Sequence, residues 1–429
     1  MRGCDGRNIG PAAQLRGRRS RTAPGVNEDN SIIQLMSESI SKPKAGGWVV
    51  RALLLSLWTL CGRAEPGKVH LLRPPDGGIQ PQAAVDSKGV LHLIYFKGQP
   101  QGGDVYYVRR APGGEAFSTP IRINVQARSA IAMGTVRGAH LAIGRNGRVH
   151  VAWMGGDGAA RAEVAGKAAT PMMYTRMNDS GTAFEPERNL LTWAAGLDGG
   201  ASVAADQSGN VYVAWHASPP GNTQGEAGRA VFVARSSDDG RRFQREERVR
   251  SKPTGACGCC GMRTYVDSAG RLYILYRGAN DVSRDMTLLI SRDHAASFET
   301  ETVNQWMTKA CPMSTCAFAE GSAGVLVATE RSGQVSFNVV DPVTLNLSKA
   351  TIAPVSDNCR HPTVAANAAG EVLMAWTEGT GWEKGGALAW QIFGKDGQAT
   401  AQSGRTEGVP VWGLPTAVGQ SDGSFVIVY

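Results

Sequence analysis

Residues 201–215 read ASVAADQSGNVYVAW, and this stretch decides the fold. A run of small and apolar residues comes first, a turn built around Gly209 follows, and a second apolar strand ends in Trp215. Short apolar strands on either side of a glycine turn are typical of a β-hairpin. The stretch therefore predicts an antiparallel pair of strands.

The same pattern occurs seven times along the chain. The other copies are PQAAVDSKGVLHLIYF (81–96), AHLAIGRNGRVHVAW (139–153), MRTYVDSAGRLYILY (262–276), CAFAEGSAGVLVATE (316–330), HPTVAANAAGEVLMAW (361–376) and LPTAVGQSDGSFVIVY (414–429). Their turn glycines, spaced 46 to 62 residues apart, are Gly89, Gly147, Gly209, Gly270, Gly324, Gly370 and Gly423. Because one such hairpin cannot bury its apolar face alone, a repeat of this length predicts four-stranded units stacked around an axis. We expect an all-β fold, a single β-propeller.

A second signature lies between the copies. Residues 236–243 read SSDDGRRF, 291–298 read SRDHAASF, 177–184 read MNDSGTAF, and a degenerate RAPGGEAF covers 110–117. The pattern S-x-D-x-G-x-x-[F/W] is the Asp box of bacterial neuraminidases, so the chain resembles the sialidase-like propellers. In that motif the carboxylates, here Asp179, Asp238 and Asp293, hold the hairpin's own backbone and the aromatic residue packs between sheets. We therefore assign these aspartates to folding and not to catalysis.

Seven copies favour seven blades. Six blades are the alternative, because sialidases have six and the fifth copy is the weakest. The chain ends directly after the second strand of the last copy, so we expect residues 68–73 (KVHLLR) to add an outer strand to that blade. Such a strand would join the first and last blades and cover both edges.

The first 64 residues differ from the rest. They hold ten Lys/Arg and four Asp/Glu, a net charge of +6 out of the total +8, which leaves +2 for residues 65–429. The apolar run WVVRALLLSLWTLC (48–61), followed by Gly62-Arg63-Ala64, predicts a secretory signal that is too short for a permanent membrane span. Met36 makes a more ordinary start for such a leader than Met1. We expect a leader over 1–64 and a monomeric propeller over 65–429 that is secreted or periplasmic.

The nearly balanced body argues against nucleic acid as a partner. Export also bears on the cysteines, because an oxidising compartment favours disulfides. Six cysteines follow the leader, and each lies just before the first strand of a repeat, in three successive repeats: Cys257, Cys259, Cys260, Cys311, Cys316 and Cys359.

Propeller topology brings those positions to one face, beside the central funnel, so we predict one cluster with at least one pair between blades, formed by Cys311 and the CGCCG segment. Two interpretations stay open. One is a set of disulfides. The other is a copper or zinc site with Cys257, Cys259, Cys260 and Cys311 as thiolates and His361 or Met313 nearby, since soft thiolates suit these metals. The segment from CGCCG to Cys311 also resembles exported sialidase-like proteins that carry a C-x-C-C element.

Charged residues gather on the loops of the same face. An arginine-rich funnel suits carboxylates and phosphates. The candidate ligand-binding residues are Arg277, Arg284, Asp285, Arg360, His361 and Glu378. These residues predict a binding site for a glycan or another small anionic ligand. We expect no cofactor other than the copper or zinc considered above.

The sialidase resemblance also implies a glycosidase, but the motifs of catalysis do not match. Active members of that family have an arginine in an F/Y-R-I-P element and a Tyr–Glu pair. The nearest string here is PIRIN (120–124), which we assign to an outer strand, and no Tyr–Glu pair can be assigned. Three functions therefore stay open: recognition of a glycan or anion without turnover, hydrolysis of a glycoside at a rearranged site, and metal or redox chemistry at the cysteines.

Overall fold

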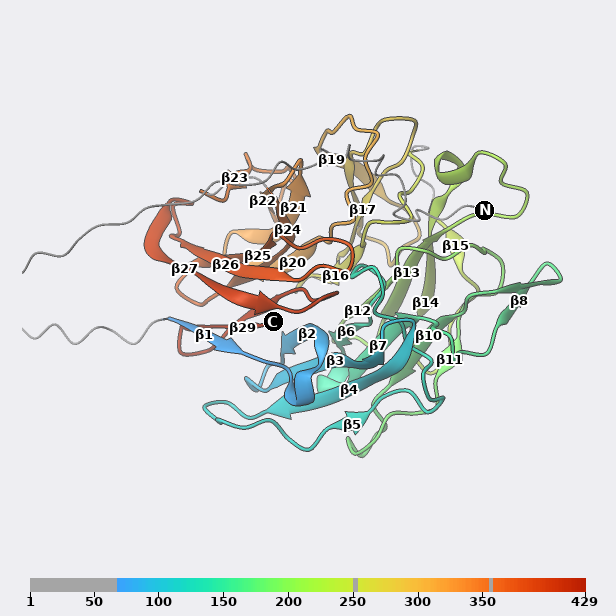
Figure 1. The fold of residues 1–429 in the computed structure, drawn as a ribbon, viewed down its shortest axis with the longest axis horizontal. Coiled ribbons are helices and arrows are strands. Elements are labelled where there is room, and N and C mark those ends of the chain that lie inside the picture. Colours follow the sequence, from blue (N-terminus) through green and yellow to red (C-terminus); the bar gives the residue numbers. More distant parts are fainter. Residues whose placement is uncertain (1–67, 250–253, 355–357) are drawn as a thin grey trace, which may run out of the picture. The chain divides into compact units, whose positions relative to one another are not determined.

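The computed structural model describes residues 68–249, 254–354 and 358–429. The predicted leader, residues 1–64, lies outside the described residues. Seven β-sheets follow one another along the described chain, one for each predicted repeat (Figure 1). The prediction of an all-β, seven-bladed propeller is confirmed, and the six-bladed alternative is wrong.

Six blades have four antiparallel strands each. Blades 1 to 3 consist of β2 (Ile79–Val85), β3 (Leu91–Gln99), β4 (Gly102–Arg110) and β5 (Ile121–Arg122); β6 (His140–Ile143), β7 (Val149–Met154), β10 (Met172–Arg176) and β11 (Arg188–Asn189); and β12 (Ala201–Ala205), β13 (Val211–Ala217), β14 (Ala230–Ser236) and β15 (Glu247–Arg248). A small hairpin of β8 (Ala162–Val164) and β9 (Lys167–Ala169) extends from blade 2.

Blades 4 to 6 follow the same order. They consist of β16 (Arg263–Val266), β17 (Leu272–Arg277), β18 (Met286–Ser291) and β19 (Glu299–Asn304); β20 (Ala317–Gly321), β21 (Gly324–Arg331), β22 (Gln334–Val340) and β23 (Thr351–Ile352); and β24 (Cys359–Ala366), β25 (Val372–Glu378), β26 (Gly386–Phe393) and β27 (Ala399–Val409). Three single-turn 3₁₀ helices, η1 (Pro75–Gly77), η2 (Arg145–Gly147) and η3 (Gly225–Gly228), lie in connections.

Blade 7 closes the ring with strands from both ends of the described chain. It contains β28 (Thr416–Gly419), β29 (Phe425–Val428) and β1 (Val69–Leu72), and β1 pairs with β29 in parallel, with Val69 opposite Phe425 (Figure 1). Lys68 adds an ion pair of 2.9 Å with Glu371 of blade 6. The predicted outer strand is therefore present.

The turn glycines explain why each repeat begins with a tight hairpin. All seven have positive φ, between 73° and 130°. Side chains disfavour this region of backbone conformation, and glycine adopts it without steric cost. The strands on either side can therefore pair in register, as Ala201 does with Trp215.

Among the described residues, seven hydrophobic clusters each lie between two neighbouring blades. The cluster between blades 7 and 1 joins Val426 and Val428 to Leu91 and Leu93. Because each blade is buried on both faces, its second and third strands are nearly continuous apolar runs, whereas outer strands such as β19 and β27 are largely polar. The fold is therefore stabilised by apolar contacts between neighbouring blades around the whole ring.

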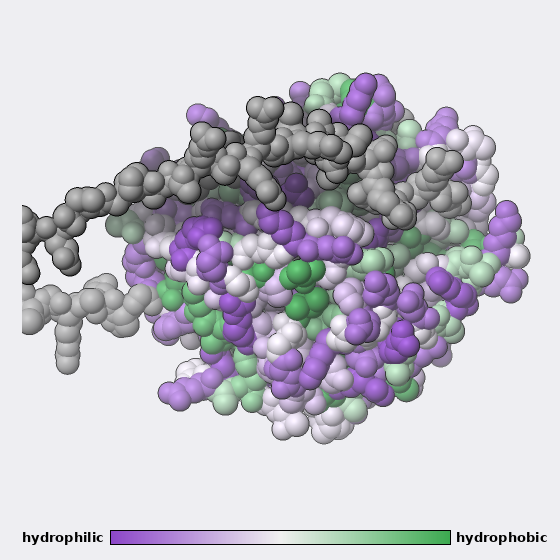
Figure 2. All heavy atoms as spheres, viewed as in Figure 1, coloured by the Kyte–Doolittle hydropathy of each residue, from purple (hydrophilic) through white to green (hydrophobic). Residues whose placement is uncertain are grey.

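The ring has two different faces. Connections that enter the first strand of a blade, and those between its second and third strands, share one face, which we call the loop face. The hairpin turns of each blade share the opposite face, the turn face. The hydrophilic residues (purple) in Figure 2 cover much of the face shown, with a few hydrophobic residues (green) among them. Over the described ranges, no helix has the length and apolar character needed to cross a membrane.

Two of the predicted Asp-box carboxylates hold their own hairpins. The Oδ1 atom of Asp238 accepts a hydrogen bond of 2.8 Å from the Arg242 amide, and that of Asp293 accepts one of 2.9 Å from the Ser297 amide. The aromatic ring of Phe243 packs on Tyr174 of the preceding blade, with 4.7 Å between ring centroids.

The same role is wrong for Asp179. Its carboxylate pairs with Arg148 at 2.6 Å, and the neighbouring Asn178 instead accepts the hydrogen bond from the Thr182 amide, at 3.0 Å. The amide side chain offers the same acceptor oxygen one position earlier in the turn, so the carboxylate is available for an ion pair.

Candidate functional site

The C-x-C-C segment forms a compact buried turn on the loop face, in the connection that enters β16. The Cys257 amide donates to the Arg277 carbonyl at 2.9 Å, and the Gly258 amide donates to Glu226 Oε1 at 2.8 Å. The turn is therefore held by blades 3 and 4 together. Cys257, Cys259 and Cys260 are 2%, 4% and 2% exposed.

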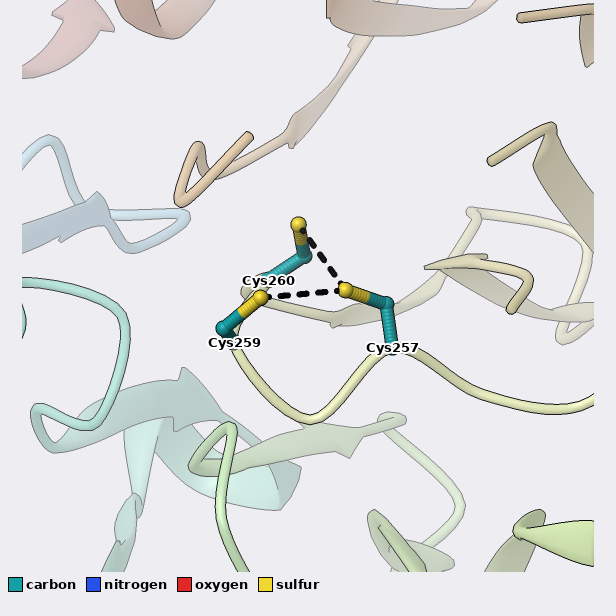
Figure 3. Close-up of side chains that lie close together, drawn as sticks. All are labelled: Cys257, Cys259 and Cys260. Atoms are coloured by element: carbon teal, nitrogen blue, oxygen red, sulfur yellow. Dashed lines mark hydrogen bonds between the residues drawn. The ribbon is translucent and has the colours of Figure 1, made fainter. Parts of the chain in front are cut away.

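The three sulfur atoms of this turn face one another (Figure 3). Cys257 Sγ lies 3.2 Å from Cys259 Sγ and 3.6 Å from Cys260 Sγ. All three sulfurs lie within 4.8 Å of one another. A turn with cysteines at its first, third and fourth positions thus brings three soft donor atoms to one point.

A fourth sulfur comes from the next blade. Cys311, in the connection that enters β20, forms a disulfide with Cys259, with a Cα–Cα distance of 6.7 Å. This is the pair between blades that the sequence predicted. Met313 packs against the same group, so a thioether also borders it. We call Cys257, Cys259, Cys260 and Cys311 the cysteine cluster.

The other two cysteines do not belong to it. Cys316 lies in the hydrophobic core between blades 4 and 5, and its thiol donates weakly to the Gly261 carbonyl at 3.7 Å. Cys359 lies in the core between blades 5 and 6. The prediction of a single cluster of six is therefore wrong: Cys316, just before β20, and Cys359, the first residue of β24, lie in the cores between blades.

The two thiols of the cluster that are outside the disulfide differ in acidity. The hydrogen bond with Cys260, together with burial, raises the pKa of Cys257 well above its usual value. Burial by itself raises the pKa of Cys260, but the hydrogen bond from Cys257 and the charge of Arg277 lower it to about 7. The pair therefore loses its first proton at a lower pH than an isolated thiol would, and the remaining proton is held between the two sulfur atoms.

The charged residues predicted for blade 4 are engaged in contacts within the protein. The Arg277 guanidinium is buried, donates to the Glu330 carbonyl at 2.7 Å and lies over the ring of Trp306. Arg284 donates to the carbonyls of Asp281 and Ser283 and approaches Glu226 at 3.5 Å. Asp285 Oδ1 accepts the Trp306 amide at 2.8 Å.

The predicted residues of blade 6 are placed differently. His361 is buried, with φ of 52°, and its amide donates to Ser314 Oγ at 3.3 Å. Burial, and then the charge of Arg360, lowers the pKa of His361 to about 3, so the ring is neutral at pH 7. Glu378 accepts hydrogen bonds from Trp376 and, at 2.7 Å, from Arg405.

Two carboxylates outside the predicted ligand-binding residues connect these groups. Glu330 is 3% exposed and lies beside Arg277; burial raises its pKa, and the charges of Arg277 and Arg360 oppose that rise. Glu226 holds both the Gly258 amide and Arg284. Nothing in their sequence context marks them, since their partners are 32 to 58 residues away.

A cavity of about 540 Å³ lies apart from the cysteine cluster, along the propeller axis. The first strands of all seven blades line it. Arg263 and His140, which were not predicted as site residues, both face it.

Comparisons with known proteins give low similarity. No family model matches the chain, and no curated protein does. Among solved structures, similar folds include the Penicillium chrysogenum α-L-arabinanase (11% identity, covering 74% of this chain and 94% of that chain, TM-score 0.48). The Hadza microbial sialidase Hz136 (14%, 77% and 74%, 0.45) and the NanB sialidase of Streptococcus pneumoniae (12%, 80% and 64%, 0.41) are others.

The sialidase resemblance expected from the sequence thus has a counterpart in the solved structures only at low identity. Because the identities are at most 14% among these three and the TM-scores stay below 0.5, neither a family nor an activity follows from them.

Proposed function

We propose that this protein is an exported propeller that binds a soft metal ion, copper(I) or zinc(II), at the cysteine cluster. One observation carries the proposal: three buried sulfur atoms lie within 4.8 Å of one another, and a fourth is joined to one of them. Sulfur atoms around a zinc ion bound at about 2.3 Å in a tetrahedron lie about 3.8 Å apart. The distance of 3.6 Å between Cys257 and Cys260 is close to that.

The surroundings also fit a soft ion. The cluster includes no carboxylate among its donor atoms, and Met313 adds a thioether at its border. Thiolate and thioether ligands favour copper(I) and zinc over magnesium or calcium. Arg277 offsets part of the negative charge that several thiolates would bring together.

All four cysteines can bind a metal ion only after the Cys259–Cys311 disulfide is reduced. Reduction of Cys259–Cys311 adds two electrons and two protons and gives two thiols, for which a dithiol reductant suffices. The reduced protein then offers four thiols, and the oxidised protein only Cys257 and Cys260. Metal affinity therefore depends on the redox state of the pair.

The number of ligands separates the two metals. Copper(I) is satisfied by the three sulfurs of the turn, whereas a structural zinc ion takes four. We expect the reduced protein to bind one equivalent of either ion. Cys260→Ser should weaken both by more than about 100-fold, beyond the effect of losing an outer-shell partner. Cys311→Ser should weaken zinc and leave copper(I) nearly unchanged.

The measurement is anaerobic titration with copper(I) or zinc(II) against a competing chelator, with absorption of the metal–thiolate bond as a second readout. Cys359→Ala is the matched control, since it removes a buried cysteine outside the cluster. If the reduced protein retains neither metal, or if Cys359→Ala weakens binding as much as Cys260→Ser, the proposal is wrong.

Recognition of a glycan or anion on the loop face stays a prediction, and the geometry supports it less. Arg277, Arg284, Asp285 and Glu378 are held by hydrogen bonds or ion pairs within the protein. A ligand there would have to replace those contacts. A glycosidase activity has no assigned nucleophile among these residues and is not part of the proposal.

A further inference from the structure

The axial cavity is closed towards one face and open towards the other. Its lining includes the hairpin-turn residues Ser208, Ser268 and Gly270, so it reaches the turn face. Towards the loop face a neck of about 10 Å³ adjoins it, lined by residues that precede the first strands, such as Gly261 and Leu414. Arg263 and His140 line both the cavity and the neck, so they lie at its closed end.

Arg263 places a positive charge at this end without a partner of opposite charge. Its Nε atom donates to the Cys316 carbonyl at 3.1 Å, and it forms no ion pair within the described ranges. Arg271, which follows β16 on the turn face, shows the contrast: it pairs with Asp267 at 2.6 Å. Burial lowers the pKa of Arg263 to about 10, so the group is still cationic at pH 7.

His140 faces the same space from blade 2. It is 8% exposed, and its Nδ1 atom is buried with no hydrogen-bond partner in the part of the chain that the structure describes. Burial, and then the charge of Arg263, lowers the pKa of His140 well below its usual value, so the ring is neutral. A neutral imidazole can donate one hydrogen bond. An unpaired cation and an unpaired imidazole thus meet at the end of one polar cavity.

An oxyanion would supply a negative charge to Arg263 and a hydrogen-bond partner to His140. Arg263 is partly exposed to the cavity and has no counterion there, and a buried nitrogen without a hydrogen bond, such as His140 Nδ1, is costly. A guanidinium offers two parallel N–H groups that match the two oxygens of a carboxylate or phosphate. The volume of about 540 Å³ also falls in the usual range for pockets that hold small molecules.

We propose that the axial cavity binds a small ligand carrying a carboxylate or phosphate group, with the oxyanion held by Arg263 and His140. The ligand enters from the turn face. There, Glu320 keeps its carboxylate engaged with the Ser268 amide and hydroxyl, so the open end is negative and the closed end positive. This polarity favours a single anionic group at the leading end and an uncharged remainder. The site is separate from the cysteine cluster and does not depend on metal.

The test uses inorganic phosphate and glucuronate as probes, the first for phosphate and the second for a carboxylate on a small neutral body. Binding is measured by calorimetry on the full chain, at constant ionic strength set with chloride. We expect one site per chain for at least one probe. Arg263→Gln should weaken that binding at least about tenfold, and His140→Asn should weaken it measurably. Arg331→Gln is the matched control, because Arg331 is exposed on the loop face between β21 and β22.

A second measurement separates lost binding from lost folding. Since Arg263 has no counterion, Arg263→Gln in chloride buffer should melt at the same temperature as the wild type or higher. Only the wild type and Arg331→Gln should gain melting temperature from the probe beyond the gain in chloride. The proposal is overturned if neither probe binds the wild type, or if Arg263→Gln and His140→Asn both bind as tightly as Arg331→Gln.

Discussion

At the scale of single residues, two adjacent aspartates show how different neighbouring positions can be. Asp238 faces partly outward and holds its own turn through the Arg242 amide. Asp239 is 2% exposed, has φ of 64°, and lies between blades 2 and 3. There its carboxylate pairs with Arg148 at 2.5 Å and approaches Arg176 at 3.4 Å. One residue shapes a hairpin, and the other forms ion pairs with two arginines of the neighbouring blade.

We therefore expect Asp239→Asn to destabilise the protein more than Asp238→Ala. Asparagine tolerates positive φ, so the backbone is not disturbed. Arg148 keeps Asp179 and Arg176 keeps Glu185, but both arginines lose the buried carboxylate of Asp239, at a cost of about 2 kcal/mol or more. Asp238→Ala removes one turn acceptor that is partly exposed, which should cost about 1 kcal/mol. Urea unfolding of both variants measures the difference, and equal losses would contradict it.

At the scale of elements, β1 contributes to two cores because its side chains alternate. Val69 and Leu71 pack into the cluster between blades 6 and 7, and Leu72 packs into the cluster between blades 7 and 1. His70 is exposed between them. Arg73, just after the strand, lies over the ring of Tyr429 at 3.6 Å. A strand of four residues thus connects the two ends of the ring.

Removal of residues 68–73 should lower the melting temperature and solubility, because it exposes the edge of β29. Leu71→Ala tests the same contact more finely: it should cost about 2 kcal/mol, at the low end for a leucine because the side chain is partly buried. His70→Ala, on the exposed side of the strand, is the control and should stay within about 0.5 kcal/mol. If the deletion and Leu71→Ala unfold like the wild type, β1 does not stabilise the ring.

At the scale of the whole molecule, the ring encloses several neutral histidines. His140, His150, His216 and His361 are at most 8% exposed. Burial lowers the pKa of each, to about 4 for His216 and about 3 for His361. In the unfolded chain these side chains bind protons below about pH 6.5, while the folded protein keeps them neutral. The unfolded state therefore binds more protons in this range, and stability rises with pH.

The free energy of unfolding should accordingly fall as the pH decreases from about 6.5 to about 5. Carboxylates are still largely ionised in this window, so the histidines dominate the change. Each can contribute up to about 1.4 kcal/mol per pH unit. Urea unfolding across the window measures the slope. A flat profile between these pH values would mean that the histidines are protonated in the folded protein.

The sequence by itself determined the fold, because the signals that specify it are local. Alternating apolar residues, the turn at Gly209 and its equivalents, and the regular return of the pattern predict hairpins and their stacking without any distant contact. Topology then placed the cysteines before the first strands of blades 4 to 6 and predicted that Cys311 would meet the C-x-C-C turn, as the disulfide shows.

Only the tertiary structure decided which side chain meets which. Arg277 looked available for a ligand but lies against Glu330, 53 residues away, whereas Arg263, unremarked in the sequence, faces the axial cavity without a counterion. Cys316 follows Cys311 by five positions and turns into a core between blades. Charges and thiols find their partners across blade boundaries, where small rotations between sheets set the distances. A pattern read along one strand does not contain that information.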